Sequence, residues 1–127
     1  EAVLLIEVDG YKEVVEREAP LVEKVCRANG AVDIKVAQTD EERDLIWFAR
    51  RNALPSLAQV KPALVLEDAT VPRSKIPNII KEIRRIAEKY NLMIGTYGHA
   101  GDGNLHPTIV IDPRDKDEVQ RMEQAVD

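Results

Sequence analysis

The two histidines of the chain lie in one short, glycine-rich stretch. Residues 98–107 read GHAGDGNLHP, and the histidines are His99 and His106. If the flanking segments pair as a hairpin across a six-residue connection, Ala100 to Leu105, we expect the imidazoles directly opposite each other, with Cβ atoms about 5 Å apart on one sheet face. Two ring nitrogens placed in this way could bind one divalent metal ion at about 2 Å each. The stretch is therefore a candidate metal site.

Two other interpretations of the stretch stay open. It could be an ordinary hairpin, because Gly101 and Gly103 permit positive φ while Asp102 and Asn104 can bond nearby backbone amides. It could cradle a phosphate, although its glycine spacing matches neither nucleotide-binding pattern and no helix follows directly. A metal site would itself be incomplete, since a divalent ion usually takes at least one more protein ligand. Asp102 is a poor third ligand because it belongs to the turn.

Two further groups could carry chemistry. Arg50 and Arg51 follow Trp47, and such a pair is either a solvated helix face or a guanidinium site for a ligand carboxylate. Trp47 itself is expected to be a packing residue. The run over residues 67–74, EDATVPRS, could offer carboxylates to a metal, but we expect it to leave the sheet and cap a helix.

The hydrophobic pattern predicts the elements that must position these residues. It indicates strands over 3–8, 32–37, 63–66, 92–97 and 105–111. Between them it predicts four helices: one ending near Gly30 and kinked or restarted at Pro20, one from Thr39 to before Pro55, one capped by Ser74, and one starting at Asp115. Glu42 and Glu118 should complete capping boxes with Thr39 and Asp115. This order favours an α+β fold, a ferredoxin-like antiparallel sheet with helices on one face.

Strand alternation gives the last two strands two unlike faces. One face is aliphatic and suits the core: Leu92, Ile94, Leu105, Ile109 and Ile111. The other carries both histidines with Met93, Gly95, Tyr97, Thr108 and Val110. A face that mixes apolar and imidazole groups more often marks a contact or ligand surface than plain exposure to water.

Composition narrows the classes of function. A chain of 127 residues is expected to form one domain. With 18 Lys and Arg against 23 Asp and Glu, and no basic stripe, it is an unlikely nucleic-acid binder. A lone Cys26, short apolar runs and no secretory pattern favour a soluble cytoplasmic protein that does not span a membrane. Both ends interrupt a predicted element, which suggests a piece of a longer protein.

GHAGDGNLHP closely resembles the histidine motif in the C-terminal domain of FAD-linked oxidases of the vanillyl-alcohol oxidase type, which include D-lactate and D-2-hydroxyglutarate dehydrogenases. Residues 47–55, WFARRNALP, and 67–77, EDATVPRSKIP, look most like the glycolate oxidase flavin subunits of that family. The resemblance covers nearly the whole chain in consistent order. It makes the plain hairpin the less favoured interpretation.

The resemblance implies a cap domain over residues 1–127, truncated at both ends, that closes a substrate pocket over a flavin. A separate N-terminal domain would hold most of the FAD, so we expect this chain alone neither to bind FAD tightly nor to turn over glycolate. His99 and His106 would be catalytic and would bind a divalent metal (Zn, Fe or Mn). Arg50 and Thr108 would contact the substrate, and Asn104 the cofactor.

The implied reaction is oxidation of a small 2-hydroxy acid to a 2-oxo acid by hydride transfer to flavin. An iron-sulfur partner subunit, and through it a peripheral place at the inner membrane, belong to the same expectation. The family's third metal ligand and its base come from a Glu-His-Gly-Ile-Gly stretch that this chain lacks. Thr108 and Leu66 stand where some relatives have asparagine and lysine, which leaves the substrate open. The alternatives are a stand-alone ferredoxin-like ligand-binding or regulatory domain and a small metallohydrolase.

Overall fold

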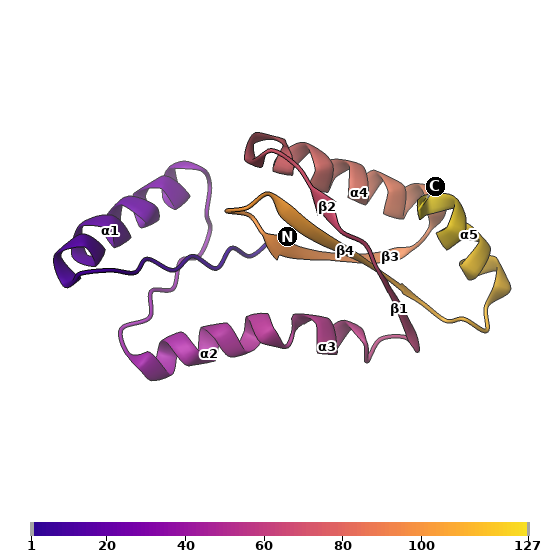
Figure 1. Cartoon of the computed structure of the whole chain (residues 1–127), viewed down its shortest axis with the longest axis horizontal. Helices are drawn as coiled ribbons and strands as arrows, with labels where there is room; N and C mark the ends of the chain where they lie inside the picture. The colour runs from indigo at the N-terminus through magenta and orange to yellow at the C-terminus, as the bar shows by residue number, and fades with distance from the viewer. Residues whose placement is uncertain (1, 127) are drawn as a thin grey trace. The chain divides into compact units, whose positions relative to one another are not determined.

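The computed structural model describes residues 2–126, whose elements are drawn in Figure 1. Internal contacts divide the chain into two compact units, one ending at Arg51 and the other beginning at Asn52. The first contains two helices, α1 (Lys12–Ala28) and α2 (Asp40–Arg51).

Helix α1 is one continuous helix that includes Pro20, so the expected restart at that residue is wrong. Its end was correctly predicted at the Asn-Gly pair. Gly30 has φ of +86°, the Ala31 N–H donates to the Cys26 carbonyl at 3.0 Å, and the Gly30 N–H donates to the Arg27 carbonyl at 3.1 Å. This is the Schellman arrangement, in which a left-handed residue lets two late amides satisfy helix carbonyls.

Helix α2 begins at the predicted cap. The Glu42 N–H donates to Thr39 Oγ1 at 3.2 Å, while the Glu42 carboxylate accepts the Gln38 N–H at 2.7 Å instead of the amide of Thr39. The capping box therefore differs from the usual one in a single bond: the glutamate carboxylate accepts the amide of the residue before the cap residue. The helix ends at Arg51, ahead of Pro55, as predicted.

The segments 3–8 and 32–37 are not strands, although both were expected to be. A strand is stabilised by backbone hydrogen bonds to a neighbour, and neither segment has a partner strand among the described residues. Glu7 of the first segment instead contacts α2, where Trp47 Nε1–H donates to its carboxylate at 2.8 Å. Apolar composition predicted the wrong element because it reports burial preference and not the presence of a pairing partner.

The second unit contains the sheet. Its elements are α3 (Ala53–Leu57), β1 (Ala63–Leu66), β2 (Ala69–Thr70), the 3₁₀ turn η1 (Arg73–Lys75), α4 (Ile76–Tyr90), β3 (Met93–His99), β4 (Asn104–Ile111) and α5 (Lys116–Val126). Strand β4 is central and antiparallel to its neighbours, with β3 along one edge and β1 then β2 along the other. From β1 onward the unit is two strands, a helix, two strands and a helix around an antiparallel sheet, and the predicted α+β class is confirmed.

Helices α4 and α5 lie on one face of this sheet (Figure 1). The core there is the predicted aliphatic face, built on Leu92, Ile109 and Ile111 with Val119 and Met122 of α5 packed against them. Gly95 on the opposite face contacts Leu57 of the short helix α3. The assignment of residues to the two faces of β3 and β4 is therefore confirmed.

Helix α4 does not begin with the predicted serine cap. Ser74 lies inside η1, and the N-cap residue is Lys75, which makes no side-chain capping bond. Pro77 stands in the first turn. Proline at this position has its φ preset for a helix and no N–H that needs a partner, so the helix can begin without a polar cap.

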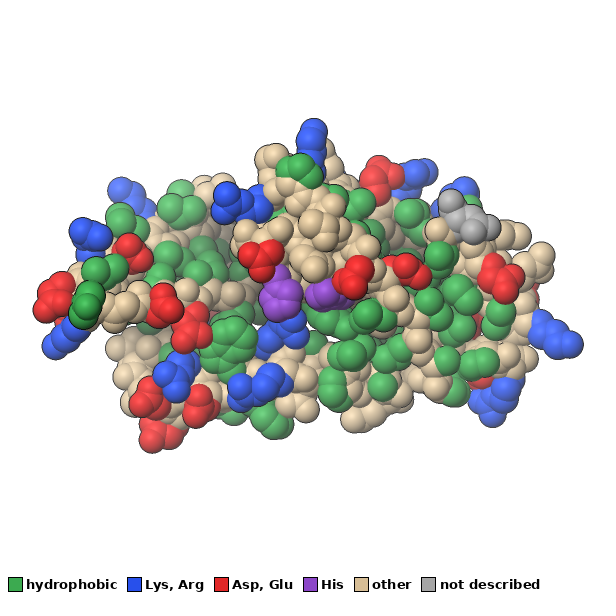
Figure 2. All heavy atoms as spheres, in the orientation of Figure 1, with side chains coloured by type: hydrophobic (Ala, Val, Ile, Leu, Met, Phe, Trp, Pro, Cys, Tyr) green, Lys and Arg blue, Asp and Glu red, His purple; other side chains and the backbone are tan. Residues whose placement is uncertain are grey.

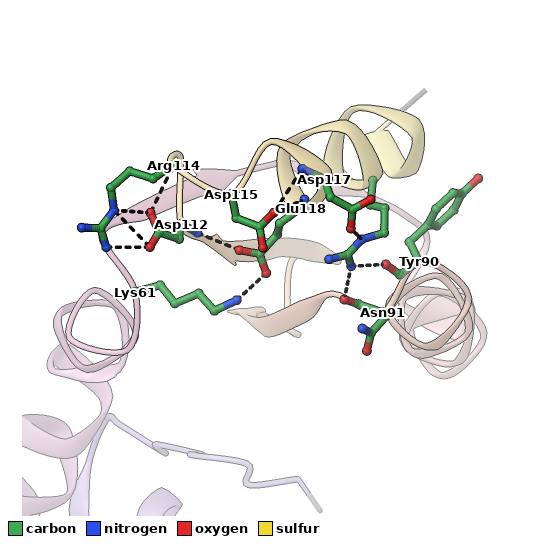
Figure 3. Close-up of polar contacts among 9 residues, drawn as sticks. Lys61, Tyr90, Asn91, Asp112, Arg114, Asp115, Asp117 and Glu118 are labelled. Carbon is green, nitrogen blue, oxygen red and sulfur yellow. Dashed lines mark hydrogen bonds and ion pairs between the residues drawn. The ribbon is translucent and has the colours of Figure 1, made fainter.

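Helix α5 begins as predicted, but its capping glutamate is used elsewhere (Figure 3). Asp115 Oδ1 accepts the Glu118 N–H at 3.1 Å. The Glu118 carboxylate, which is buried, accepts the Asp112 N–H at 2.8 Å and pairs with Lys61. These two contacts, the amide first, lower the pKa of Glu118. Glu118 thus joins α5 to the end of β4 and to the segment that precedes β1.

Acid should weaken this end of the sheet. Hydrogen bonds from Arg114 lower the pKa of Asp112 from 3.8 to about 2. A carboxyl group whose folded pKa is lowered stabilises the fold above its unfolded pKa and loses that contribution as the pH falls through the folded value. In Asp112→Asn, the free energy of unfolding should therefore fall less steeply between about pH 4 and about pH 2 than in wild type.

Urea unfolding across that pH range checks this expectation. Asp102→Asn, at an exposed turn position, is the control and should keep the wild-type slope. Equal slopes in wild type and Asp112→Asn would contradict the prediction.

Candidate functional site

The hairpin between β3 and β4 is tighter than expected. His99 pairs with Asn104, and Tyr97 pairs with His106, so the histidines are not directly opposite each other. The turn is Ala100 to Gly103, closed by the Asp102 N–H on the His99 carbonyl at 3.0 Å. The predicted register is wrong because turn length decides the register and two extra residues were assigned to the turn.

The histidines nevertheless share a face, as predicted. They are diagonal neighbours on adjacent strands, with ring centroids 5.8 Å apart and ring planes at 88°. In Figure 2 the two imidazoles lie next to each other on the visible surface. The hairpin therefore brings the two rings together even though its register differs from the expected one.

Gly103 and Gly98 allow the close backbone approaches that this turn requires. Gly103 has φ of +75°, and a Cβ on it would lie 2.0 Å from the Val71 carbonyl oxygen. A Cβ on Gly98 would lie 2.3 Å from the Asn104 carbonyl oxygen. Gly101, which would also permit a positive φ, does not adopt one, and a Cβ on it would meet nothing within 4 Å.

Asp68 is a site residue that the sequence did not single out. Leu66 pairs with Thr108 and Ala69 with Leu105, so the same register places Asp68 beside His106. Asp68 Oδ1 and His106 Nδ1 are 2.5 Å apart. The run containing Asp68 was expected to leave the sheet and cap a helix, with its carboxylates as possible metal ligands; instead Ala69 and Thr70 pair with β4, and the partner of Asp68 lies 38 residues away. No local spacing in the sequence signals that contact.

His106 is consequently enclosed on three sides. Asp68 adjoins it from the link between β1 and β2, Tyr97 from β3 with ring centroids at 5.6 Å, and His99 from the diagonal position on β3. Its side chain is only 19% exposed. In this arrangement the Nδ1 atom of His106 contacts a carboxylate, and the neighbouring rings limit the orientation of the imidazole.

Comparison with known proteins decides the family. The family described as FAD linked oxidases, C-terminal domain, matches residues 1–127. The chain belongs to this family. The resemblance that the histidine motif suggested is confirmed.

Curated relatives of this FAD-linked oxidase C-terminal domain include three with clear similarity over nearly all of it. Glycolate oxidase subunit GlcD of Bacillus subtilis (strain 168) is 56% identical over 98% of the chain, and GlcD of Escherichia coli (strain K12) is 36% identical over 98%. The probable mitochondrial D-lactate dehydrogenase of Danio rerio is 36% identical over 94%. The chain spans about a quarter of the length of these relatives, between 24% and 26%.

The remaining predicted residues of this oxidase domain lie in different settings. Asn104, across from His99, has a buried side-chain oxygen with no hydrogen-bond partner among the described residues. Thr108 is completely buried, and its hydroxyl donates to the His106 carbonyl at 3.4 Å. Arg50 is half-buried in the last turn of α2, in the first unit. Its proposed contact with a substrate stays a prediction, as does that of Thr108.

The histidine pair fits part of a metal site. Each ring nitrogen lies about 1 Å from its ring centre, so rings at this separation can place one nitrogen each at about 2 Å from a common ion. Within the described residues, no group of three His, Cys, Asp or Glu side chains is placed to hold a metal. The site as described therefore supplies two ligands, and metal binding stays a prediction.

The orphan oxygen of Asn104 fits a cofactor contact. A buried acceptor without a partner costs free energy unless a donor reaches it, and a flavin offers N–H donors.

Over residues 2–126, no helix is long and apolar enough to cross a membrane.

Proposed function

We propose that this chain is the cap domain of an FAD-dependent 2-hydroxy-acid oxidase or dehydrogenase of the glycolate or D-lactate type. The observation that carries the proposal is the paired histidines on one sheet face of a chain that belongs to the FAD-linked oxidase family. The parent enzyme would oxidise the hydroxy acid to the 2-oxo acid. The C2 hydrogen would leave as hydride to the flavin, and the hydroxyl proton would go to a base.

The residues of this chain would bind and orient the reactants. His99 and His106 would hold a divalent ion (Zn, Fe or Mn) and so act in catalysis, with further ligands from outside the described residues. The metal, when bound, would lower the pKa of the substrate hydroxyl. Arg50 would bind the substrate carboxylate through its planar guanidinium. Asn104 would accept a hydrogen bond from the cofactor, and Thr108 would help to shape the substrate pocket.

The partners follow from the same proposal. An N-terminal domain of the parent chain would hold most of the FAD, and a small 2-hydroxy acid would be the substrate. An iron-sulfur subunit could accept the electrons and bring the enzyme to the inner membrane from the cytoplasm. Family membership favours this proposal over a stand-alone regulatory domain or a metallohydrolase.

The test uses the whole flavoenzyme that carries this domain. Anaerobic addition of D-lactate or glycolate should bleach its flavin absorbance, and His106→Ala should lower kcat/KM for the better substrate about 100-fold. Asp102→Asn, in the exposed turn beside the site, is the control and should keep the wild-type rate. Flavin that neither acid reduces, or an equal rate in His106→Ala, would overturn the proposal.

A further inference from the structure

The residues before and after Asp68 both pair with β4, the strand that carries His106. Before Asp68, the Glu67 N–H donates to the Pro107 carbonyl at 2.9 Å. After it, Ala69 pairs with Leu105. Backbone bonds on either side place Asp68 opposite His106, so the contact between the two side chains follows from the sheet register.

The contact also determines which ring nitrogen carries the proton. An ionised carboxylate only accepts hydrogen bonds, so the nitrogen facing it must be a donor. In a neutral imidazole this leaves Nε2 without a proton and with its lone pair available. Metal ions bind an imidazole through such a lone pair, and a carboxylate on the other nitrogen makes the ring a better ligand.

We propose that Asp68 is a positioning residue, which holds His106 as the Nδ1-protonated tautomer and presents Nε2 to a divalent metal. The metal half of this inference rests on the proposed function; the tautomer half does not. Asp68 is not itself a ligand, since its Oδ1 is already bonded to the imidazole and no three-ligand cluster exists among the described residues. His99 would be the neighbouring metal ligand.

The experiment compares this chain with Asp68→Ala and Asp68→Val. Valine cannot accept a hydrogen bond but favours the extended backbone between two strands, so it keeps the test usable if the alanine variant folds poorly. Glu67→Gln is the matched control because it removes one negative charge at the neighbouring residue. The Glu67 side chain lies on the opposite sheet face, where it lines a groove with Ile83 and Ile109. The first readout is the ¹⁵N NMR spectrum of the imidazoles at about pH 9. The second is Co²⁺ affinity by calorimetry.

Wild type and Glu67→Gln should show His106 protonated at Nδ1, whereas both Asp68 variants should shift the proton toward Nε2. Co²⁺ affinity should fall by about 10-fold to 100-fold in the Asp68 variants and stay at the wild-type value in Glu67→Gln. Wild-type His106 protonated at Nε2, or an unchanged tautomer without Asp68, would overturn the assignment. A tautomer change in the Asp68 variants with no fall in Co²⁺ affinity would support the role of Asp68 in holding the tautomer and contradict the metal half of this inference.

Discussion

Replacing Gly103 by alanine is expected to destabilise the second unit by about 4 kcal/mol. Alanine at φ of +75° adopts a strained backbone conformation, and its Cβ would lie 2.0 Å from the Val71 carbonyl oxygen. That overlap can be relieved only by moving Val71 away, which breaks the bond from the Val71 N–H to the Gly103 carbonyl, now 2.9 Å long. Strand β2 would then separate from β4, and Asp68 would lose its place beside His106. Urea unfolding measures the loss.

Gly101→Ala is the matched control, since it makes the same change two residues away. Gly101 does not have a positive φ, and a Cβ there would meet nothing within 4 Å. Its free energy of unfolding should stay within about 0.5 kcal/mol of wild type. If the two variants lose equal stability, the turn geometry described above is wrong.

Removing the cation of the Lys61–Glu118 pair is expected to cost about 3 kcal/mol in Lys61→Met. The Glu118 side chain is 7% exposed, so without Lys61 its carboxylate would be buried with the Asp112 N–H as a hydrogen-bond donor but with no counter-charge. Because the Lys61 side chain is 33% exposed, we expect the loss of stability to fall at the lower end of the range for buried ion pairs. Thermal or urea unfolding followed by circular dichroism measures it.

The double variant Lys61→Met with Glu118→Gln separates the buried charge from lost packing. Glutamine still accepts the Asp112 N–H but carries no charge, so the double variant should regain most of the lost stability. Lys81→Met, at an exposed position of α4, should change stability little. A double variant as unstable as Lys61→Met would show that the buried charge is not the cause.

The local elements of the second unit could be read from the sequence with small errors at their ends. β1 was predicted over its full range, and β3 and β4 within two residues at each end. Alternation in β3 and β4 assigned the histidines to one face and Ile109 and Ile111 to the other, because side-chain direction follows from strand geometry alone. The same apolar signal failed at 3–8 and 32–37, where the described structure offers no partner strand.

The glutamate of the predicted α5 capping box shows a different limit. Asp115 caps the helix as expected, but Glu118 is paired with a residue 57 positions away instead of its local partner. A capping box is a local pattern, and a half-buried cation near the same carboxylate offers a stronger charge-assisted bond. The sequence cannot reveal that competition.

By itself, the sequence determined the family, the α+β class of the second unit and the placing of His99 and His106 on one sheet face, since motif, periodicity and alternation are properties of neighbouring residues. Only the tertiary structure decided the hairpin register, the diagonal relation of the two rings and the contact of Asp68 with His106. Those depend on how segments far apart in the chain align across β4. That alignment is set by turn length and by backbone pairing between strands, which no local pattern encodes.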